Sequence, residues 1–235
     1  MLSYYSFKPP SLEHFFGTDA LGRDIFSRVI YGSRYSTWIG FISIFISLVI
    51  GGNLGLIGGY FGGRVDNVIM RCMDVMFAFP GILLALFIAA TLGPGLTNLM
   101  IALGISAVPG YARVARSSVL SVKEKPYIEA ARSIGCNNFN IIFRHILPNV
   151  IAPLIVLSTM GLASRILSAA ALSFIGLGAQ PPTPEWGLML SEGRGYLRVA
   201  WWMTTFPGLA IMFVVFGINI LGDGLRDALD PRFYR

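Results

Sequence analysis

Three stretches of this chain carry no charged side chain over lengths that would cross a membrane. They lie between Arg34 and Arg64, between Asp74 and Arg113, and between Arg198 and Asp223. A helix needs only about 20 apolar residues to cross the hydrocarbon core of a bilayer. Charged residues make up 13% of the chain, about half of their usual share in soluble domains. These patterns predict an all-α integral membrane protein.

The uncharged stretches divide into five predicted spans. The stretch after Asp74 is too long for one helix, and Leu-Gly-Pro-Gly at residues 92–95 is a turn sequence that splits it into a hairpin. A further uncharged region, residues 150–184, is interrupted only by Arg165 and predicts one span followed by a loop. The spans are predicted near residues 37–60, 75–92, 97–117, 149–172 and 202–222.

The basic residues of the connecting segments predict the orientation of these spans. Most of them lie after the first span, in the long segment after the third span, and in the C-terminal tail. Because Lys and Arg accumulate on the cytoplasmic side, we expect a multi-pass plasma (inner) membrane protein whose C-terminus and loop at 121–149 are cytoplasmic. Orientation and anionic lipid headgroups then explain the net charge of +6, which does not indicate nucleic-acid binding.

The same topology places residues 1–34 outside the membrane, before a transmembrane domain at 35–235. The N-terminal segment carries the basic residues Lys8, Arg23, Arg28 and Arg34. It contains no apolar stretch that could act as a signal peptide. We interpret this as a first transmembrane helix that is missing upstream of this chain, and a true five-span protein is the alternative.

The cytoplasmic loop at 121–149 begins with a pattern typical of a short amphipathic helix. Pro126 suits the first turn of a helix. Ile128, Ala131 and Ile134 follow at a spacing of three, which places them on one face. Gly135 then permits the chain to turn.

A second short helix is predicted between this turn and Pro148. Asn137 or Asn138 can cap it, and its apolar stripe is formed by Phe139, Ile142, Phe143 and Ile146. Two such helices meeting at a glycine would form a compact knob that docks into a groove on another protein. The alternative is a helix pair that lies on the lipid headgroups.

The same loop resembles a known family. Glu129-Ala130-Ala131, Gly135 and Leu147-Pro148 match the EAA loop of permease subunits of bacterial ABC importers, and His145 is the variant of the peptide and nickel branch. The match continues from residue 15 onward through Gly17-Thr18-Asp19, Gly22-Arg23-Asp24, Gly59-Tyr60-Phe61-Gly62-Gly63, Ala78-Phe79-Pro80, Pro109-Gly110-Tyr111 and Gly222-Asp223-Gly224. These strings are most similar to the second, C-type permease of a dipeptide, oligopeptide or nickel importer.

The resemblance implies an ABC importer permease fold of six spans, five of which this chain would hold. It also implies a heterodimer with a second permease, two cytoplasmic ABC ATPase subunits and an extracytoplasmic solute-binding protein. ATP and Mg²⁺ would bind to the ATPases, since this chain has no Gly-Lys dipeptide and so no P-loop. We expect no enzymatic activity, cofactor or metal site in it. The expected cargo is di- or oligopeptides. The alternatives are nickel or another small solute, and a secondary transporter working alone.

The residues of the EAA loop that carry the resemblance are Glu129, Ala130, Ala131, Gly135, His145, Leu147 and Pro148. Within this set we assign the alanines to close docking on the ATPase, Gly135 to the turn, and Glu129 to a polar or ionic contact. A short helix seated in an ATPase cleft would transmit its closure to the flanking spans as rigid-body motion.

Two polar residues inside predicted spans are candidates for the pathway. Arg165 would either extend to the outer headgroups or form a cationic group near the outer mouth that favours a substrate carboxylate. Asn53 would face the pathway or bond to a neighbouring helix. It lies among Gly51, Gly55 and Gly59, whose spacing lets another helix approach closely.

The loop before the last span is predicted to lie outside. Its polar and aromatic residues Glu185, Trp186, Glu192, Arg194 and Arg198 would meet a binding protein or cap the cavity. Trp201 and Trp202 are predicted to form an interfacial aromatic belt.

Overall fold

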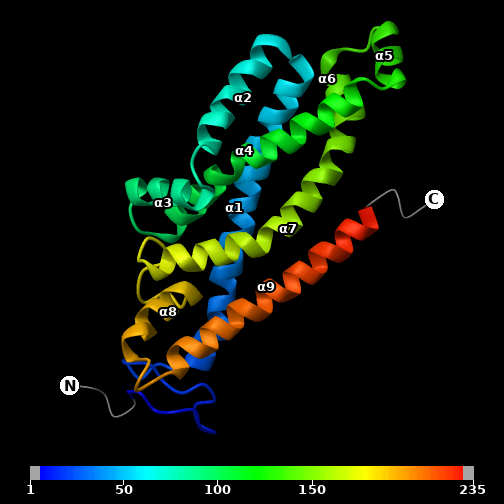
Figure 1. Ribbon diagram of the computed structural model, residues 1–235. Coiled ribbons are helices and arrows are strands. Elements are labelled where there is room, and N and C mark those ends of the chain that lie inside the picture. The colour runs from blue at the N-terminus through cyan, green and yellow to red at the C-terminus, as the bar shows by residue number, and fades with distance from the viewer. Residues whose placement is uncertain (1–5, 230–235) are drawn as a thin grey trace.

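The computed structural model describes residues 6–229, and helices dominate this range (Figure 1). The long helices are α1 (Ile25–Phe61), α4 (Leu96–Lys123), α7 (Leu147–Phe174) and α9 (Trp202–Leu229). The shorter ones are α2 (Gly63–Phe77), α3 (Gly81–Leu92), α5 (Pro126–Ser133), α6 (Asn138–Asn140) and α8 (Trp186–Gly193). A π-helical turn, η1 (Ile141–Ile146), precedes α7, and a 3-10 turn, η2 (Arg194–Tyr196), follows α8. These elements confirm the predicted all-α class.

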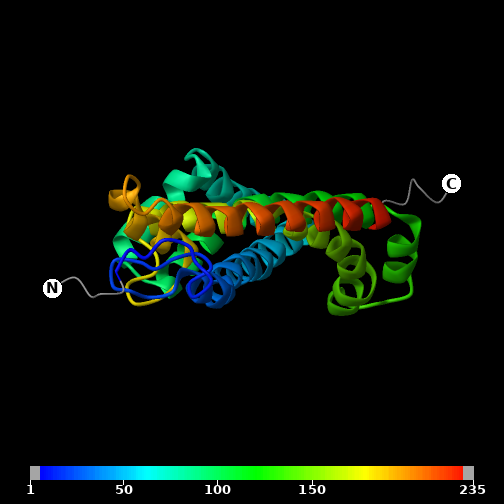
Figure 2. The same ribbon diagram turned by 90° about the horizontal axis from the view of Figure 1, so that it is seen from below.

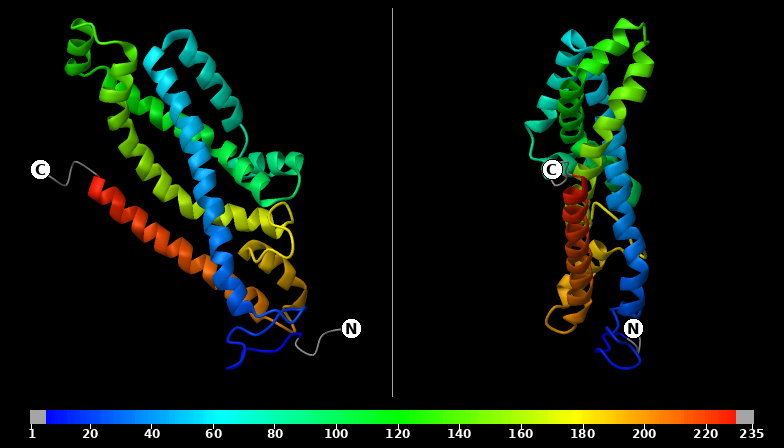
Figure 3. Two further views of the ribbon diagram at one scale, coloured as in Figure 1. Left: turned by 180° about the vertical axis from the view of Figure 1, so that it is seen from behind. Right: turned by 90° about the vertical axis from the view of Figure 1, so that its right-hand side faces the viewer.

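The helices form a thin slab, broad in one view and narrow at right angles to it (Figure 3). α5 and α6 lie at one end, which we call the knob end, as Figure 1 shows. The N-terminal segment and α8 lie at the other end, which we call the clamp end (Figure 2). α1 runs between the two ends, and α4 and α7 pack side by side.

Four of the five predicted spans are confirmed as long apolar helices. Helices of sufficient length and hydropathy cover Ile25–Phe61, Leu96–Lys123, Asn138–Phe174 and Trp202–Ala228. The first is longer than predicted, because Asp24 starts α1 well before residue 37 by accepting a hydrogen bond from the N–H of Ser27. The predicted boundary between residues 34 and 35 therefore falls inside a helix.

The remaining span, predicted at 75–92, is not a single helix. α2 and α3 meet at a bend of 89°. Pro80 explains the break, because it lacks an N–H and disfavours the helical conformation in the residue before it. α3 alone is about 18 Å long, too short for a hydrocarbon core about 30 Å thick. The α2–α3 pair is thus a broken span or a re-entrant loop.

Glycines on α1 let α4 pack directly against its backbone, as their spacing predicts. A side-chain carbon added at Gly51 would lie 2.5 Å from the carbonyl oxygen of Val108, and one added at Gly55 would overlap that of Ala112. One turn before these glycines, Ser47 donates a hydrogen bond to the carbonyl of Gly104. Close backbone approach and such bonds hold membrane helices together where lipid is as apolar as the side chains.

Candidate functional site

The knob comprises α5, the turn at Gly135, α6 and η1. Ile128 and Ala131 of α5 are buried in the same apolar cluster as Val122 of α4 and Ile141 of η1. Ala130, one residue earlier, is exposed. The structure corrects the assignment of both alanines to docking: Ala131 is 6% exposed, because it shares the inner face of α5 with Ile128 at a spacing of three.

Gly135 adopts the left-handed conformation that the predicted turn requires, with φ at 84°. Its N–H donates to the carbonyl of Arg132 at 3.0 Å. After the turn, the Asn137 side chain accepts a hydrogen bond from the N–H of Asn140 at 2.8 Å and caps α6. The turn reverses the chain so that the two halves of the knob pack on each other.

The second helix of the knob does not end before Pro148, as the sequence predicted, but runs on through η1 into α7. Pro148 has no N–H, and in an α-helix its ring would clash with the carbonyl of Arg144. The helix widens here into a π turn, in which the N–H of Leu147 bonds to the carbonyl of Ile142. Five-residue spacing then places Ile141 and Ile146 on one buried face.

The predicted apolar stripe is thereby divided. Phe139 and Phe143 lie on the outside, with ring centroids 4.4 Å apart. Together with Tyr127 and Ile134 they form an exposed apolar group, which we call the knob surface, and Ile134 is 80% exposed. Among the residues that match the EAA loop, Glu129 and Pro148 are exposed, while His145 and Leu147 are half-buried.

Tyr60, at the end of α1, links the knob to the spans, a role that sequence reasoning missed. It is buried, and its hydroxyl donates to the Asn138 side chain at 2.6 Å. Its carbonyl accepts from the ammonium of Lys123 at 2.6 Å. The only signal in the sequence was the string Gly59–Gly63, which resembles the family pattern but does not indicate what Tyr60 does.

One continuous apolar cluster connects the knob to the centre of the slab. It begins with Ile128 in α5, passes through Ile146 and Val150, and reaches Ile166 in α7. Tyr111 and Val119 of α4 belong to the same cluster. Because packed interiors transmit displacement, α5 cannot shift without affecting α4 and α7.

Three basic residues in the second half of α4 bind their own chain. Arg116 forms a two-pronged ion pair with Asp66 of α2. Arg113 pairs with Asp74 at 2.7 Å, and Lys123 bonds to α1 as described. They therefore brace α2 and α1 against α4 rather than standing free at the knob.

Arg165 is half-buried in α7 and faces α4. Its Nη1 lies 3.5 Å from the carbonyl oxygen of Leu103 and 3.4 Å from the hydroxyl of Ser106. Asn53 is exposed, and its amide donates to the carbonyl of Val49 in its own helix at 2.6 Å. The predicted bond from Asn53 to a neighbouring helix is therefore wrong.

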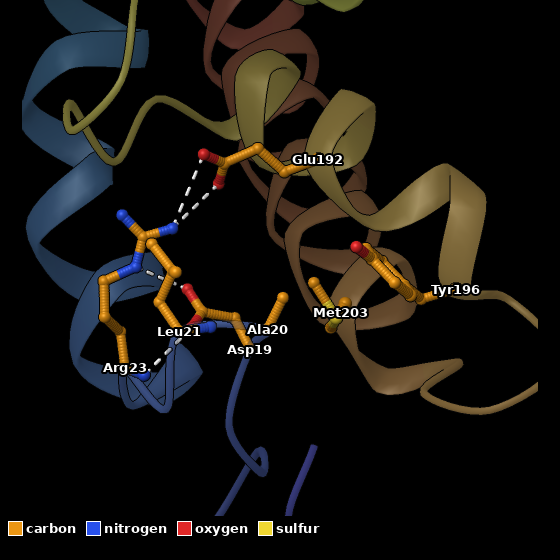
Figure 4. A pocket seen from close by; sticks show the side chains of 7 residues that line it. All are labelled: Asp19, Ala20, Leu21, Arg23, Glu192, Tyr196 and Met203. Atoms are coloured by element: carbon orange, nitrogen blue, oxygen red, sulfur yellow. Dashed lines mark hydrogen bonds and ion pairs between the residues drawn. The ribbon is translucent and has the colours of Figure 1, made fainter. Parts of the chain in front are cut away.

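At the clamp end, a network of charges fixes the N-terminal segment to α8 (Figure 4). The buried Asp19 accepts from Arg23 and from Arg28, each at 2.6 Å. Arg28 also pairs with Glu192 at 3.0 Å. Beside this network lies a pocket of about 200 Å³ lined by Asp19, Ala20, Leu21, Arg23, Glu192, Tyr196 and Met203.

The aromatic and acidic residues near α8 are mostly internal, contrary to the predicted roles. Trp186 and Trp202 are buried, and Trp202 donates to the carbonyl of Thr18 instead of anchoring at a membrane interface. Trp201 is half-exposed. Burial raises the pKa of the Glu185 carboxyl, against hydrogen bonds from the backbone of Gly187 and Leu188 that lower it. Within residues 6–229, no group of three His, Cys, Asp or Glu side chains is placed to hold a metal ion.

Comparison with known proteins defines the class to which this fold belongs. Residues 51–235 match the family described as binding-protein-dependent transport system inner membrane component, and the chain belongs to this family. Two solved structures share the fold. A chain of the inward-facing MetNI methionine ABC transporter gives a TM-score of 0.69 at 20% identity over 87% of this chain and 97% of that chain. A chain of an amino acid ABC transporter with histidines gives 0.60 at 17% identity, over 88% and 94%.

Curated relatives narrow the class further. The dipeptide transport system permease protein DppC of Alkalihalophilus pseudofirmus is 54% identical over 95% of this chain and 73% of its own length. The glutathione transport system permease protein GsiD of Pectobacterium atrosepticum is 49% identical over 95% and 74%. The chain is thus an ABC importer permease of the peptide branch, as the EAA loop indicated.

Proposed function

We propose that this chain forms half of a translocation pathway for di- and oligopeptides. A second permease supplies the other half, two ABC ATPases drive the cycle, and an extracytoplasmic binding protein delivers the peptide. The relatives named for dipeptide and glutathione transport support this cargo, since glutathione is itself a short peptide. In this assembly ATP and Mg²⁺ belong to the ATPases.

The proposed orientation places the knob end and the C-terminus in the cytoplasm. Basic residues accompany the knob: Arg132 lies in α5, Arg144 lies in η1, and Lys125 directly precedes α5. The positive-inside rule favours this side for the cytoplasm. The knob surface then meets the ATPase, and the clamp end meets the binding protein.

The observation that carries the proposal is the apolar cluster that joins α5 to Ile166. On one side of α5 lies the knob surface, exposed and apolar, as a docking surface requires. On the other side, α5 is packed into a continuous core with α4 and α7. Movement of an ATPase bound to the knob surface is therefore transmitted to both spans as a rigid-body shift.

A charge placed on the knob surface tests this docking. Ile134 is exposed in this chain, so Ile134→Glu should leave the fold intact. Buried without a partner in an interface, the new carboxylate should cost about 2–5 kcal/mol, which corresponds to at least about tenfold weaker binding. We expect the ATPases to be lost when the permease pair is purified through a tag on this chain.

The matched control is Leu12→Glu, an equally exposed leucine at the clamp end. It should leave ATPase binding unchanged. If Ile134→Glu also retained the ATPases and the peptide-stimulated hydrolysis of ATP, the assignment of the knob surface would be wrong.

A further inference from the structure

Arg165 lies well inside α7, away from either end of the helix. It is about 14 Å along the axis from Phe174, where α7 ends, and Ser106 is about 15 Å from Leu96, where α4 begins. Both residues of the contact therefore lie more than two turns from the nearer ends of their helices. The guanidinium turns toward α4.

The charge of Arg165 has no acidic partner in the part of the chain that the structure describes. Its two acceptors, the carbonyl of Leu103 and the hydroxyl of Ser106, are neutral, and both are long contacts to Nη1. Among residues 6–229, nothing accepts a hydrogen bond from Nε or Nη2. By contrast, Arg113 and Arg116 on α4 each pair with a carboxylate. A cation inside a membrane needs an anion or water to compensate for its lost hydration.

Hydroxyl groups continue from Arg165 toward the knob end between α4 and α7. The Tyr111 hydroxyl lies 3.2 Å from that of Ser158. Beyond them is a pocket of about 330 Å³ lined by Ser117, Ser118, Ser121, Val122, Lys125, Asn149 and Pro153. We call this polar strip, from Arg165 and Ser106 to the pocket, the α4–α7 seam. A side-chain carbon added at Gly110 of α4 would meet nothing within 4 Å.

We propose that Arg165 binds the carboxylate of a peptide substrate as the peptide passes along the α4–α7 seam, an inference that rests on the proposed function. The two remaining donors of the guanidinium, Nε–H and Nη2–H, lie side by side and can bond to the two oxygens of a carboxylate in bidentate geometry. The contacts of Nη1 with Ser106 and Leu103 orient these two donors. Every unmodified peptide carries one such carboxylate, so the site recognises the class without reading its side chains.

The position of Arg165 also connects substrate binding to the knob. Its neighbour Ile166 is the far end of the apolar cluster that begins at Ile128. A shift of α7 against α4 therefore moves Arg165 relative to Ser106. Closure of the ATPases would in this way change the position of the guanidinium relative to Ser106. The guanidinium would bind the carboxylate in one state and release it in the other.

The test compares a tripeptide with its C-terminal amide in proteoliposomes that hold the whole complex. The binding protein is supplied in excess, and its loading with each peptide is measured separately by calorimetry. In the native complex we expect the free acid to be transported about 10- to 100-fold faster than the amide, because a charge-assisted pair is lost with the amide. Arg165→Gln should bring this ratio close to one, chiefly by slowing the free acid, and Arg165→Lys should retain part of it.

Arg226→Gln, at an exposed arginine in the last turn of α9, is the matched control and should keep the native ratio. If Arg165→Gln slowed both peptides equally, or reduced the yield of the intact complex, the guanidinium would pair with an acidic side chain of the second permease, and the proposal would be overturned. An unchanged ratio would overturn it as well. Failure of the native complex to transport either peptide would instead contradict the proposed function.

Discussion

Single glycines determine how closely α1 and α4 pack, and Gly55 is the most restrictive of them. A side-chain carbon there would overlap the carbonyl of Ala112 and lie 2.7 Å from the Ala115 side chain. Gly55→Ala should destabilise the chain by about 1–3 kcal/mol, the usual cost of overpacking. The measurement is the unfolding temperature of the purified permease in detergent.

Gly217→Ala gives the comparison, because nothing lies within 4 Å of that glycine in α9. There the alanine should be neutral or stabilising by up to about 1 kcal/mol, since glycine disfavours a helix. Equal unfolding temperatures for the two variants would show that the α1–α4 contact does not depend on the missing side chain.

At the scale of single residues, the sequence predicted contacts that follow from residue spacing. It did not predict which partner a side chain bonds to. The glycine spacing on α1 indicated a close helix contact, and the contact is present. The interfacial role predicted for Trp202 was wrong, because this side chain bonds to Thr18 across the chain. Of the two roles predicted for Asn53, the bond to a neighbouring helix is not formed, because its amide bonds to its own helix. Neither partner follows from local pattern.

The turn at Gly135 matters at the scale of an element, because it fixes α5 against η1. Gly135→Ala would place a side chain at a φ of 84°, at a cost of about 1–2 kcal/mol. Gly135→Pro adds the loss of the hydrogen bond to Arg132 and a fixed φ of opposite sign. Peptide-stimulated ATP hydrolysis should fall modestly in the first variant and severely in the second.

Basal ATP hydrolysis by the same complexes separates coupling from assembly. It should persist in Gly135→Ala, because the knob surface is retained. A Gly135→Pro complex that assembles and responds to peptide like the native one would contradict the role of the turn.

The elements themselves were predicted where local signals agreed. Pro126 marked the start of α5. Four of the spans predicted from charge and length are confirmed as long apolar helices. The region of the predicted span at 75–92 is bent, and the second knob helix extends beyond its predicted end. Proline explains both differences, because Pro80 breaks a helix and Pro148 widens one. Whether a proline ends, bends or widens a helix depends on its packing.

At the scale of the whole molecule, the ion pairs at the clamp end join the N-terminal segment and the start of α1 to α8. Arg28 bonds to Asp19 and to Glu192, a residue 164 positions away. Arg28→Gln removes one of the two arginines that pair with these carboxylates, while Arg23 keeps its contacts to both. We expect a loss of about 1.5–3 kcal/mol, the usual value of a hydrogen bond to a charged group. Limited proteolysis should then cut within residues 6–24 faster than in the native protein.

Arg113→Gln breaks an ion pair whose two side chains are 50% and 54% exposed. Such a pair contributes at most about 1 kcal/mol, so this variant should resist proteolysis like the native chain. Equal cleavage of both variants would count against the clamp. Nothing in the sequence predicted this network, because the string containing Asp19 and the residue Glu192 are linked only through the fold.

Pro153 lies inside α7, between the knob and Arg165. Because proline has no N–H, one backbone hydrogen bond of the helix is missing there, and α7 can bend at this residue. The segment from Pro153 to Arg165 is about 18 Å long at 1.5 Å per residue. If the segment after Pro153 tilts by about 10°, the guanidinium moves by about 3 Å, which is the length of a hydrogen bond. Such a tilt, imposed at the knob, is enough to exchange one set of partners of the guanidinium for another.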